Sequence, residues 1–471
     1  MDRCGLFING KQQPTLEYYP VMHKYRKEPI AEVSEASTED LHQAVDAAHQ
    51  AFGRPWSIHE RYRALERAAD LLAERAEEFA LLITQESGKP LKESRVEAMR
   101  GQQTLRYSAV AARTLKGQEV PIAGNPGSER RLAFTIRKPY GVTLAITPFN
   151  FPLNLVLHKV GPALAAGNPV VLKPAPATPL TALKLAQLLH EAGVPAGYIN
   201  VVTGMGPEIG EQLVKDLRVE LISFTGSAAV GQLIRGQAGL RPVLLELGNN
   251  SANIVHEDAD IEAAARVLAA RAYGYAGQVC ISVQRIYVHH NIWNAFRSAI
   301  ERATQQLVVG DPEDPNTDVG PMINEAAAER AERWYQEALN AGAHAIVEGT
   351  RQGSMFSPGL LEDVAPSLRV MSEEVFAPLA GLVPYHDMDE AIEWANQSRY
   401  GLQAGIFTQN LGVAMNAAQK LQVGGVMVND SSSYRADNMP YGGIKESGIG
   451  REGPEFAIEE MTYPTVIVLN L

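Results

Sequence analysis

The chain has 471 residues, 45% of them hydrophobic, and a formal net charge of −12 at pH 7. This size favours more than one domain, and the acidic balance argues against a nucleic-acid partner, which usually meets a basic face. The start "MDRCGLFING" has no apolar signal region, and no stretch reaches the roughly 18 apolar residues of a membrane span. The two cysteines, Cys4 and Cys280, indicate neither a disulfide framework nor a metal cluster. We therefore expect a cytoplasmic protein without a membrane or metal partner.

The predicted elements change in character along the chain. From Glu39 to Arg113 apolar residues recur at helical spacing, as in "DLHQAVDAAHQAF", which predicts long surface helices. From Gly141 onward, short β-branched runs such as "NPVVLKP", "YINVVTG" and "VELISFTG" alternate with helical segments such as "TALKLAQLLHEAG". This alternation predicts βαβ units and a mostly parallel sheet with helices on both faces.

A second strand and helix series follows Gly248. Here "IEAAARVLAARAYGYAG" is predicted to be helical as far as Gly277, "QRIYVH" to be a strand, and the region 325–341 to be helical. Further strands are predicted at "HAIVEG", "GLLEDV", "AGIFTQN" and "GGVMVND". The segments "RRLAFTIRKPYG" and "YPTVIVLNL" alternate like strands without helices between them, so we expect a small projecting sheet whose free edge favours an oligomer.

Two motifs at strand ends are suited to a dinucleotide. In "ISFTGSAAVGQLI" a strand leads through Gly226, Ser227 and Gly231 into a helix, which points backbone N–H groups at an anion such as a pyrophosphate. A tight turn is the alternative interpretation. Lys173 ends the strand of "VVLKPAPATP" at the ligand-binding edge of an open sheet, where it can bind ribose hydroxyls or simply be solvated.

Three further side chains are candidates for covalent chemistry. Asn150 lies in the stiff loop "PFNFP", as a rigid oxyanion donor or as the cap of a helix beginning near Leu153. Glu246 ends an apolar strand, so a raised pKa and a role as general base compete with pairing to an arginine. Cys280 follows the predicted helix, where nearby amides would favour an exposed thiolate, although lone cysteines are often buried and inert. We assign Cys4 to that inert class.

Together these groups describe the oxidation of an aldehyde. A thiol adds to the carbonyl, the tetrahedral oxyanion expels hydride to a nicotinamide, and the remaining thioester is hydrolysed. The chain indeed resembles the aldehyde dehydrogenase superfamily from "LFINGK" to "TVIVLN". The motifs "PFNFP", "KPAPATP", "FTGSAAVG", "LELGNN", "GQVC", "EEVFAP" and "PYGGIKESGIGREG" follow the family order.

The resemblance implies roles for individual residues and NAD+ or NADP+ as the cofactor. Cys280 would be the nucleophile, Glu246 the base for the deacylating water, Asn150 the oxyanion donor beside the Cys280 amide, and Lys159 a proton relay. The implied cofactor contacts are Lys173 and Glu374 on ribose, Phe376 near the nicotinamide, and Ile146, Thr147, Pro148, Phe149, Pro176, Gly206, Phe224, Thr225, Gly226, Ser227, Val230, Gly231, Leu247 and Gly248.

The resemblance also implies an α/β fold in three parts. These are a Rossmann-like cofactor domain (1–118 and 139–247), a second α/β catalytic domain (248–450) and a small β oligomerisation element (119–138 and 451–471), assembled as a homodimer or homotetramer. Acyl transfer to coenzyme A or phosphate, a non-catalytic NAD(P)-binding protein and a cofactor-free thiol esterase are the alternatives. The presence of Glu246 argues against acyl transfer, because that reaction needs no activated water.

Three departures from the family pattern bear on these expectations. Asn249 replaces a glycine, and we expect it to tolerate a left-handed backbone. Ala377 also replaces a glycine, a minor packing change. Pro176 stands where strongly NAD-preferring members often carry a glutamate, so repulsion of a 2′-phosphate is absent and NADP is permitted beside NAD.

The substrate is expected to be a small, polar or anionic aldehyde. The segments "YAGQVCISVQR", "PLNLVLHK" and "NDSSSYRADNMPYGG" resemble the branch of lactaldehyde, nonphosphorylating glyceraldehyde-3-phosphate and phosphonoacetaldehyde dehydrogenases. Lactaldehyde, glyceraldehyde 3-phosphate or a semialdehyde-like compound would fit. Arg435, Arg106 and His158 are the candidate substrate contacts, with a salt bridge or core packing as the alternative for each.

Overall fold

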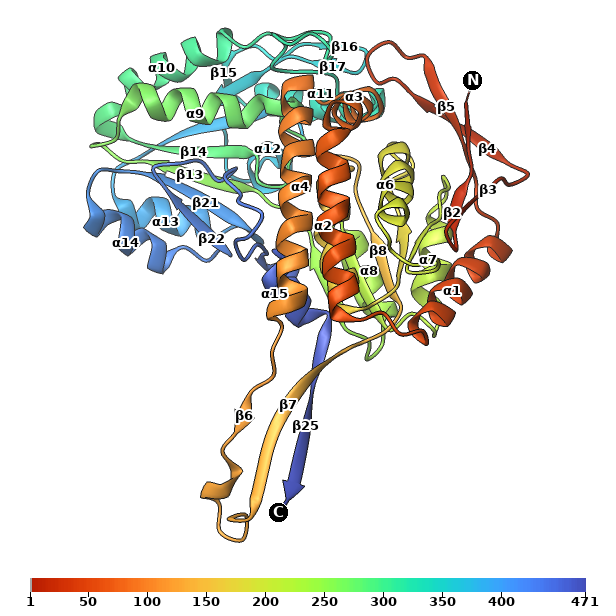
Figure 1. Cartoon of the computed structure of the whole chain (residues 1–471). Helices are drawn as coiled ribbons and strands as arrows, with labels where there is room; N and C mark the ends of the chain where they lie inside the picture. Colours follow the sequence, from red (N-terminus) through yellow and green to blue (C-terminus); the bar gives the residue numbers. More distant parts are fainter. Residues whose placement is uncertain (1) are drawn as a thin grey trace.

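Two α/β sheets dominate residues 2–471, which the computed structural model of the protein describes, and a narrow third sheet projects away from them (Figure 1). This arrangement confirms the predicted α/β class. Within these described residues, no helix combines the length and the apolar character needed to cross a membrane.

The first sheet has a parallel centre built from the β-branched runs. Its strand order is β24-β12-β11-β8-β9-β10-β2-β3. The bounds are β2 Leu6–Ile8, β3 Lys11–Gln13, β8 Thr143–Ile146, β9 Val170–Lys173, β10 Ile199–Val201, β11 Leu221–Thr225, β12 Val243–Glu246 and β24 Gly448–Ile449. Successive side chains face opposite sides of a strand, so Val170 and Leu172 join one core and Val171 joins another.

Helices cover both faces of this sheet. The core that contains Val170 is formed with α2 (Ile58–Glu74), α3 (Ala76–Ser87), α4 (Leu91–Thr114), α5 (Asn154–Ala166) and α6 (Leu180–Glu191). The core that contains Val171 is formed with α1 (Thr38–Phe52), α7 (Pro207–Lys215) and α8 (Ala228–Gln237). All residues of α5 are buried, which makes it the central helix of this half.

The second sheet also has a parallel centre, and its strand order is β15-β18-β19-β14-β13-β21-β22. Its strands are β13 Ser251–Val255, β14 Val283–His289, β15 His344–Val347, β18 Gly359–Glu362, β19 Leu379–Tyr385, β21 Gln403–Phe407 and β22 Gly425–Val428. Helices α9 (Ile261–Tyr273), α10 (Trp293–Gln305) and α11 (Glu325–Asn340) share one core with it, and α13 (Met388–Asn396) and α14 (Leu411–Lys420) share the other. Short elements complete the chain: β1 Arg3–Cys4, β4 Tyr18–Met22, β5 Pro29–Ser34, β16 Arg351–Gln352, β17 Met355–Phe356, α12 Arg369–Ser372, β20 Tyr400–Gly401 and β23 Ile444–Lys445.

The projecting sheet consists of β6 (Glu119–Val120), β7 (Arg131–Pro139) and β25 (Thr462–Asn470). β7 and β25 pair antiparallel along their whole length, and Val466 and Val468 remain 57% and 50% exposed. Helix α15 (Pro454–Glu460) packs on α4 and α5 instead, and β24 adds an edge strand to the first sheet. The division of the chain into domains at the residues given above stays a prediction.

The helix before Cys280 ends earlier than its sequence pattern predicts. α9 stops at Tyr273, and Tyr275, Ala276 and Gly277 all have positive φ. A Cβ atom at Gly277 would lie 2.1 Å from the carbonyl oxygen of Ala377. Contact with this distant loop, which a helical repeat cannot reveal, therefore overrides the local propensity and turns the chain before the cysteine.

A buried ion pair fixes the loop that carries Asn150. Lys89 and Glu97, both fully buried, form an ion pair at the start of α4. Glu97 Oε1 also accepts the backbone N–H groups of Leu153 (3.0 Å) and Asn154 (3.1 Å) at the start of α5. The Lys89 ammonium lies 3.6 Å from the ring centroid of Phe151. The carboxylate thus caps α5 in place of the Asn150 side chain, for which a capping role was an alternative.

We predict that Glu97→Gln lowers the free energy of unfolding by about 3 kcal/mol, because it leaves the Lys89 charge buried without a partner. Thermal unfolding of the purified variant measures this loss as a lower midpoint. Glu77→Gln is the matched control, since Glu77 pairs with Arg95 on the surface and such pairs contribute about 1 kcal/mol or less. Equal midpoints for the two variants would contradict the prediction.

Candidate active site

Cys280 lies at the wall of a cavity of about 220 Å³ between the two sheet regions. Its Sγ lies 3.0 Å from the Tyr441 hydroxyl oxygen. Burial raises the pKa of the Cys280 thiol to about 12, although the hydrogen bond with Tyr441 and the charge of Arg435 act in the opposite direction. Desolvation thus outweighs the nearby donors and opposes the thiolate that the sequence favoured.

Asn150 is buried and aimed at the turn that holds the cysteine. Its Nδ2 donates to the carbonyl oxygen of Gln278 at 2.9 Å. Its Oδ1 is buried and has no hydrogen-bond partner within residues 2–471. Nδ2 carries two hydrogens and only one of them points to Gln278, so the other is available to donate to an oxyanion that develops beside Cys280.

Glu246, at the end of β12, belongs to a buried group of charged side chains. Its Oε2 has no hydrogen-bond partner in the described chain, and burial and then the charge of Glu452 raise the pKa of Glu246 well above its ordinary value. Glu452 accepts from Lys159 Nζ at 2.9 Å and from Arg435 Nη2 at 2.9 Å. Although burial opposes ionisation, the charges of Lys159 and Arg435 lower the pKa of Glu452 to about 2. Of two neighbouring carboxyl groups, Glu246 therefore holds the proton.

Three arginines line the cavity at Cys280, and only one of them was expected. Arg435 lines it as predicted, together with Arg100 of α4 and Arg271 of α9. Arg100 forms a two-point ion pair with Asp437 (3.0 and 2.7 Å). Arg271 is exposed and forms no ion pair with any group in residues 2–471.

The other two predicted substrate contacts lie elsewhere. Arg106 is on the outer face of α4, where it pairs with Asp70 at 2.8 Å and does not line the cavity. His158 is buried with Nε2 3.0 Å from Asp437 Oδ1, and burial and the Arg435 charge lower the pKa of the imidazole to about 4. Their alternative interpretations, a surface salt bridge and a core histidine, are the ones that fit these contacts.

The predicted cofactor residues gather at the carboxyl edge of the first sheet. Ile146 pairs in register with Lys173 and with Phe224, and Thr225 with Glu246. Ser227 caps α8, accepting the N–H of Val230 at 3.4 Å. The strand ends and the start of α8 therefore form one continuous edge, the position at which dinucleotides bind to open α/β sheets.

Of the two groups expected to bind ribose, Lys173 is buried and Glu374 is partly buried. Burial lowers the pKa of Lys173 and raises that of Glu374 to about 7, although the backbone N–H of Asn249 donates to Glu374 Oε1 at 3.0 Å. A Cβ atom at Gly248 would lie 2.6 Å from Glu374 Oε2, so a larger residue there would displace this carboxylate. The rings of Phe149 and Phe376 pack edge to face, with their centroids 5.9 Å apart.

Six of the twelve buried side-chain polar atoms without partners within residues 2–471 lie in or beside these predicted sites. They are Thr147 Oγ1, Thr225 Oγ1, Asn150 Oδ1, Glu246 Oε2, His158 Nδ1 and Arg435 Nε. Buried polar atoms in native proteins are normally satisfied, so unsatisfied ones mark places where a ligand or water completes the site. The residues present thus fit a nicotinamide dinucleotide and a polar substrate.

Two of the departures from the family pattern have visible consequences. The tolerance of Asn249 for a left-handed backbone is not needed, since its φ is not positive, and its side chain bonds within the turn: Nδ2 donates to Ser251 Oγ at 2.6 Å. Pro176 is partly exposed. Because a proline carries no charge, the residue at this position does not repel a 2′-phosphate.

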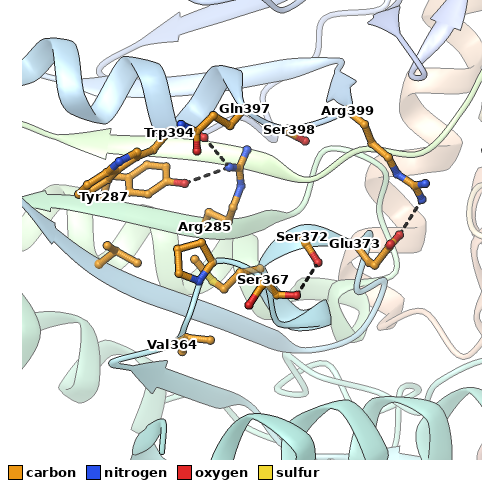
Figure 2. A pocket seen from close by; sticks show the side chains of 13 residues that line it. Arg285, Tyr287, Val364, Ser367, Ser372, Glu373, Trp394, Gln397, Ser398 and Arg399 are labelled. Atoms are coloured by element: carbon orange, nitrogen blue, oxygen red, sulfur yellow. Dashed lines mark hydrogen bonds and ion pairs between the residues drawn. The ribbon is translucent and has the colours of Figure 1, made fainter. Parts of the chain in front are cut away.

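A larger cavity, of about 590 Å³, lies on the second sheet and contains none of the predicted site residues. Several of its polar groups bond to one another, as Figure 2 shows. Arg285 donates to the Tyr287 hydroxyl and to the Trp394 carbonyl, and Arg399 pairs with Glu373 at 2.6 Å. The charged groups of this cavity are therefore already hydrogen-bonded or paired.

Several residues of the site were not predicted from the sequence. Tyr441 and Glu452 stand inside the quoted motif "PYGGIKESGIGREG", but nothing local shows that they face the cysteine and the lysine. Arg100 could have been considered together with Arg106, because both lie in the same predicted helix. The two are six residues apart and therefore on different faces, and only one face could point to the cavity. Arg271 carried no signal until the helix end was known.

Comparison with known proteins agrees with this geometry. Residues 11–467 match the model of the aldehyde dehydrogenase family. A 3-sulfolactaldehyde dehydrogenase of Priestia aryabhattai is 52% identical over 99% of this chain and 98% of its own length. A lactaldehyde dehydrogenase of Methanococcus maripaludis is 38% identical over 99% of this chain and 100% of its own. The structure of an NADP-dependent glyceraldehyde-3-phosphate dehydrogenase of Bacillus halodurans with NADP superposes with a TM-score of 0.96, at 37% identity and full coverage of both chains.

We predict that alkylation of Cys280 by iodoacetamide, in protein without cofactor, accelerates about tenfold per pH unit from pH 7 to 10. The thiolate is the reactive form, and its fraction keeps rising below a pKa of about 12. Mass spectrometry of the Cys280 peptide gives the rate, and Cys280→Ser identifies any signal from Cys4. A plateau near pH 8 would show that the resting thiol is not desolvated.

Proposed function

Because the chain belongs to the aldehyde dehydrogenase family and is an NAD(P)-dependent oxidoreductase, we propose that it oxidises a short aldehyde with a strongly acidic group at the far end. A three-carbon 2-hydroxyaldehyde with a terminal sulfonate, 3-sulfolactaldehyde, is the proposed substrate. The 52% identity of this chain to the 3-sulfolactaldehyde dehydrogenase of Priestia aryabhattai supports this choice. Glyceraldehyde 3-phosphate is the second candidate, supported by the relative in Bacillus halodurans.

The observation that carries this proposal is the charge of the cavity wall. Arg100, Arg271 and Arg435 present three guanidinium groups in a cavity only large enough for a small molecule, beside Glu93 and Glu97, of which Glu97 is already paired with Lys89. Guanidinium groups bind sulfonate, phosphate and carboxylate through paired N–H donors. Arg271 has no carboxylate partner within residues 2–471 and so retains its full charge for a substrate.

We assign the chemical steps to the chain's own residues as follows. The Cys280 thiol first gives its proton to water, the thiolate sulfur then attacks the aldehyde carbon, and the carbonyl oxygen, now negative, accepts an N–H from the Asn150 amide. After oxidation a thioester remains on Cys280. Glu246 then takes a proton from a water that attacks the thioester, and the ion pair between Lys159 and Glu452 behind it relays that proton outward.

NAD+ or NADP+ supplies the hydride acceptor when bound. The ribose hydroxyls would be held by Lys173 and Glu374, and the pyrophosphate by the first turn of α8 at Ser227. The other residues predicted at this edge would enclose the bases, with Phe376 and Phe149 beside the nicotinamide.

The projecting sheet supports a homo-oligomer, dimer or tetramer, because its exposed valines and free edge invite pairing with a second copy. The two free cysteines fit a reducing compartment, and we propose the cytoplasm. In this assembly the segments 119–138 and 451–471 would form the oligomerisation element.

We predict that Arg271→Gln reduces kcat/KM for 3-sulfolactaldehyde at least about tenfold, because a charge-assisted hydrogen bond to the anion is lost. Activity towards neutral lactaldehyde should stay within about twofold. The matched control is Arg266→Gln, which removes the same charge from an exposed position of the same helix outside the cavity. Assays with glyceraldehyde 3-phosphate decide between a sulfonate and a phosphate. An unchanged ratio of anionic to neutral activity in Arg271→Gln would refute the anion-binding role.

We predict that Glu246→Gln allows one burst of NAD(P)H per active site and then slows turnover by about 100-fold or more, since only thioester hydrolysis needs the base. The raised pKa of Glu246 means that the basic form grows as pH rises, so wild-type deacylation should accelerate with pH and the variant should lose that dependence. Glu220→Gln, at the opposite end of the sheet, serves as the control. Deacylation at the wild-type rate in Glu246→Gln would remove this role.

A further inference from the structure

The Tyr441 hydroxyl has one polar neighbour, and that neighbour is the proposed nucleophile. Tyr441 is only 2% exposed, and within residues 2–471 its hydroxyl oxygen contacts no polar side chain other than Cys280 Sγ, at 3.0 Å. A buried hydroxyl is costly unless it is hydrogen-bonded. This contact therefore satisfies the tyrosine as well as the cysteine, although the two residues are 161 positions apart.

The tyrosine is held in place by its backbone and by its ring. The backbone N–H of Tyr441 donates to Glu452 O at 3.1 Å, and that of Glu452 donates to Tyr441 O at 2.7 Å. The Arg435 guanidinium stacks over the ring with its carbon 3.7 Å from the centroid. Since Glu452 also binds Arg435, ring, cation and carboxylate form one rigid unit.

The cysteine side of the contact is fixed to the same loop. Ser432 Oγ and Ser433 Oγ both donate to the carbonyl oxygen of Ile281, at 3.0 and 2.7 Å. The loop that carries Arg435 and Tyr441 is thus hydrogen-bonded to Ile281, the residue directly after Cys280. The separation of sulfur and hydroxyl is therefore set by the loop rather than by two freely rotating side chains.

We propose that Tyr441 is a positioning residue that holds Cys280 Sγ in the attacking orientation and donates its O–H to the sulfur once the thiol has lost its proton. This inference rests on the proposed role of Cys280 as nucleophile. A hydrogen bond to the anion favours the thiolate over the thiol. The guanidinium over the ring strengthens the donor, because it draws electron density from the phenol. When the sulfur bonds to the aldehyde carbon, its charge moves to the carbonyl oxygen and the tyrosine loses its anionic acceptor.

The test compares Tyr441→Phe with the wild type in iodoacetamide alkylation of Cys280, without cofactor, at several pH values from 7 to 10. Removal of the O–H should slow alkylation roughly tenfold or more at every pH, since the thiolate loses a charge-assisted hydrogen bond. Tyr434→Phe is the matched control, as Tyr434 belongs to the same loop but is 49% exposed. Thermal unfolding midpoints show whether each variant is folded.

Equal alkylation rates in folded Tyr441→Phe and wild type would overturn the proposal, because a tyrosine that only packs would leave the thiolate fraction unchanged. The proposed function has a separate test in the same experiment. If wild-type protein alkylated at Cys280 keeps its NAD(P)-dependent activity, the assigned nucleophile is wrong, whatever the variant shows. If alkylation abolishes activity while both rates are equal, only the role of Tyr441 fails.

Discussion

The Glu452 carboxylate, shared by Lys159 and Arg435, is the interaction on which the arrangement at Cys280 depends. It joins the central helix α5 to the loop after β22, two parts of the chain far apart in sequence. Two cations bound to one anion leave Glu452 ionised, and its charge in turn favours the protonated form of Glu246. This single buried carboxylate thus holds Lys159 and Arg435 in place and also favours the protonated form of Glu246.

Burial acts in the same direction on the other titratable groups of the site. It raises the pKa of the Cys280 thiol to about 12 and that of Glu374 to about 7. Both shifts favour the neutral form of the group. A neutral thiol is a weak nucleophile and less open to oxidation, so desolvation both slows and protects Cys280. Reactivity then depends on groups that favour the anions, among them the Tyr441 hydroxyl.

The sequence predicted what is local and missed what is long-range. Strand ends such as Lys173 and Glu246 could be placed because β-branched runs define strands, and parallel strands bring their carboxyl ends to one edge. The left-handed turn after Tyr273 could not, because it follows from contact with the distant Ala377. The partner of Cys280 was likewise invisible, since only the folded chain shows that Tyr441 faces it.

The three cavity arginines differ in how much charge they leave for a substrate. Arg100 and Arg435 are each matched by a carboxylate, so they act mainly as donors in fixed positions. Arg271 is exposed, and burial raises the pKa of the Glu93 carboxyl group that lines the same cavity, which weakens its opposing charge. Attraction of an anion therefore arises mostly at Arg271, away from the reacting atoms. Such binding is made equally in the ground and transition states, and so it changes KM more than kcat.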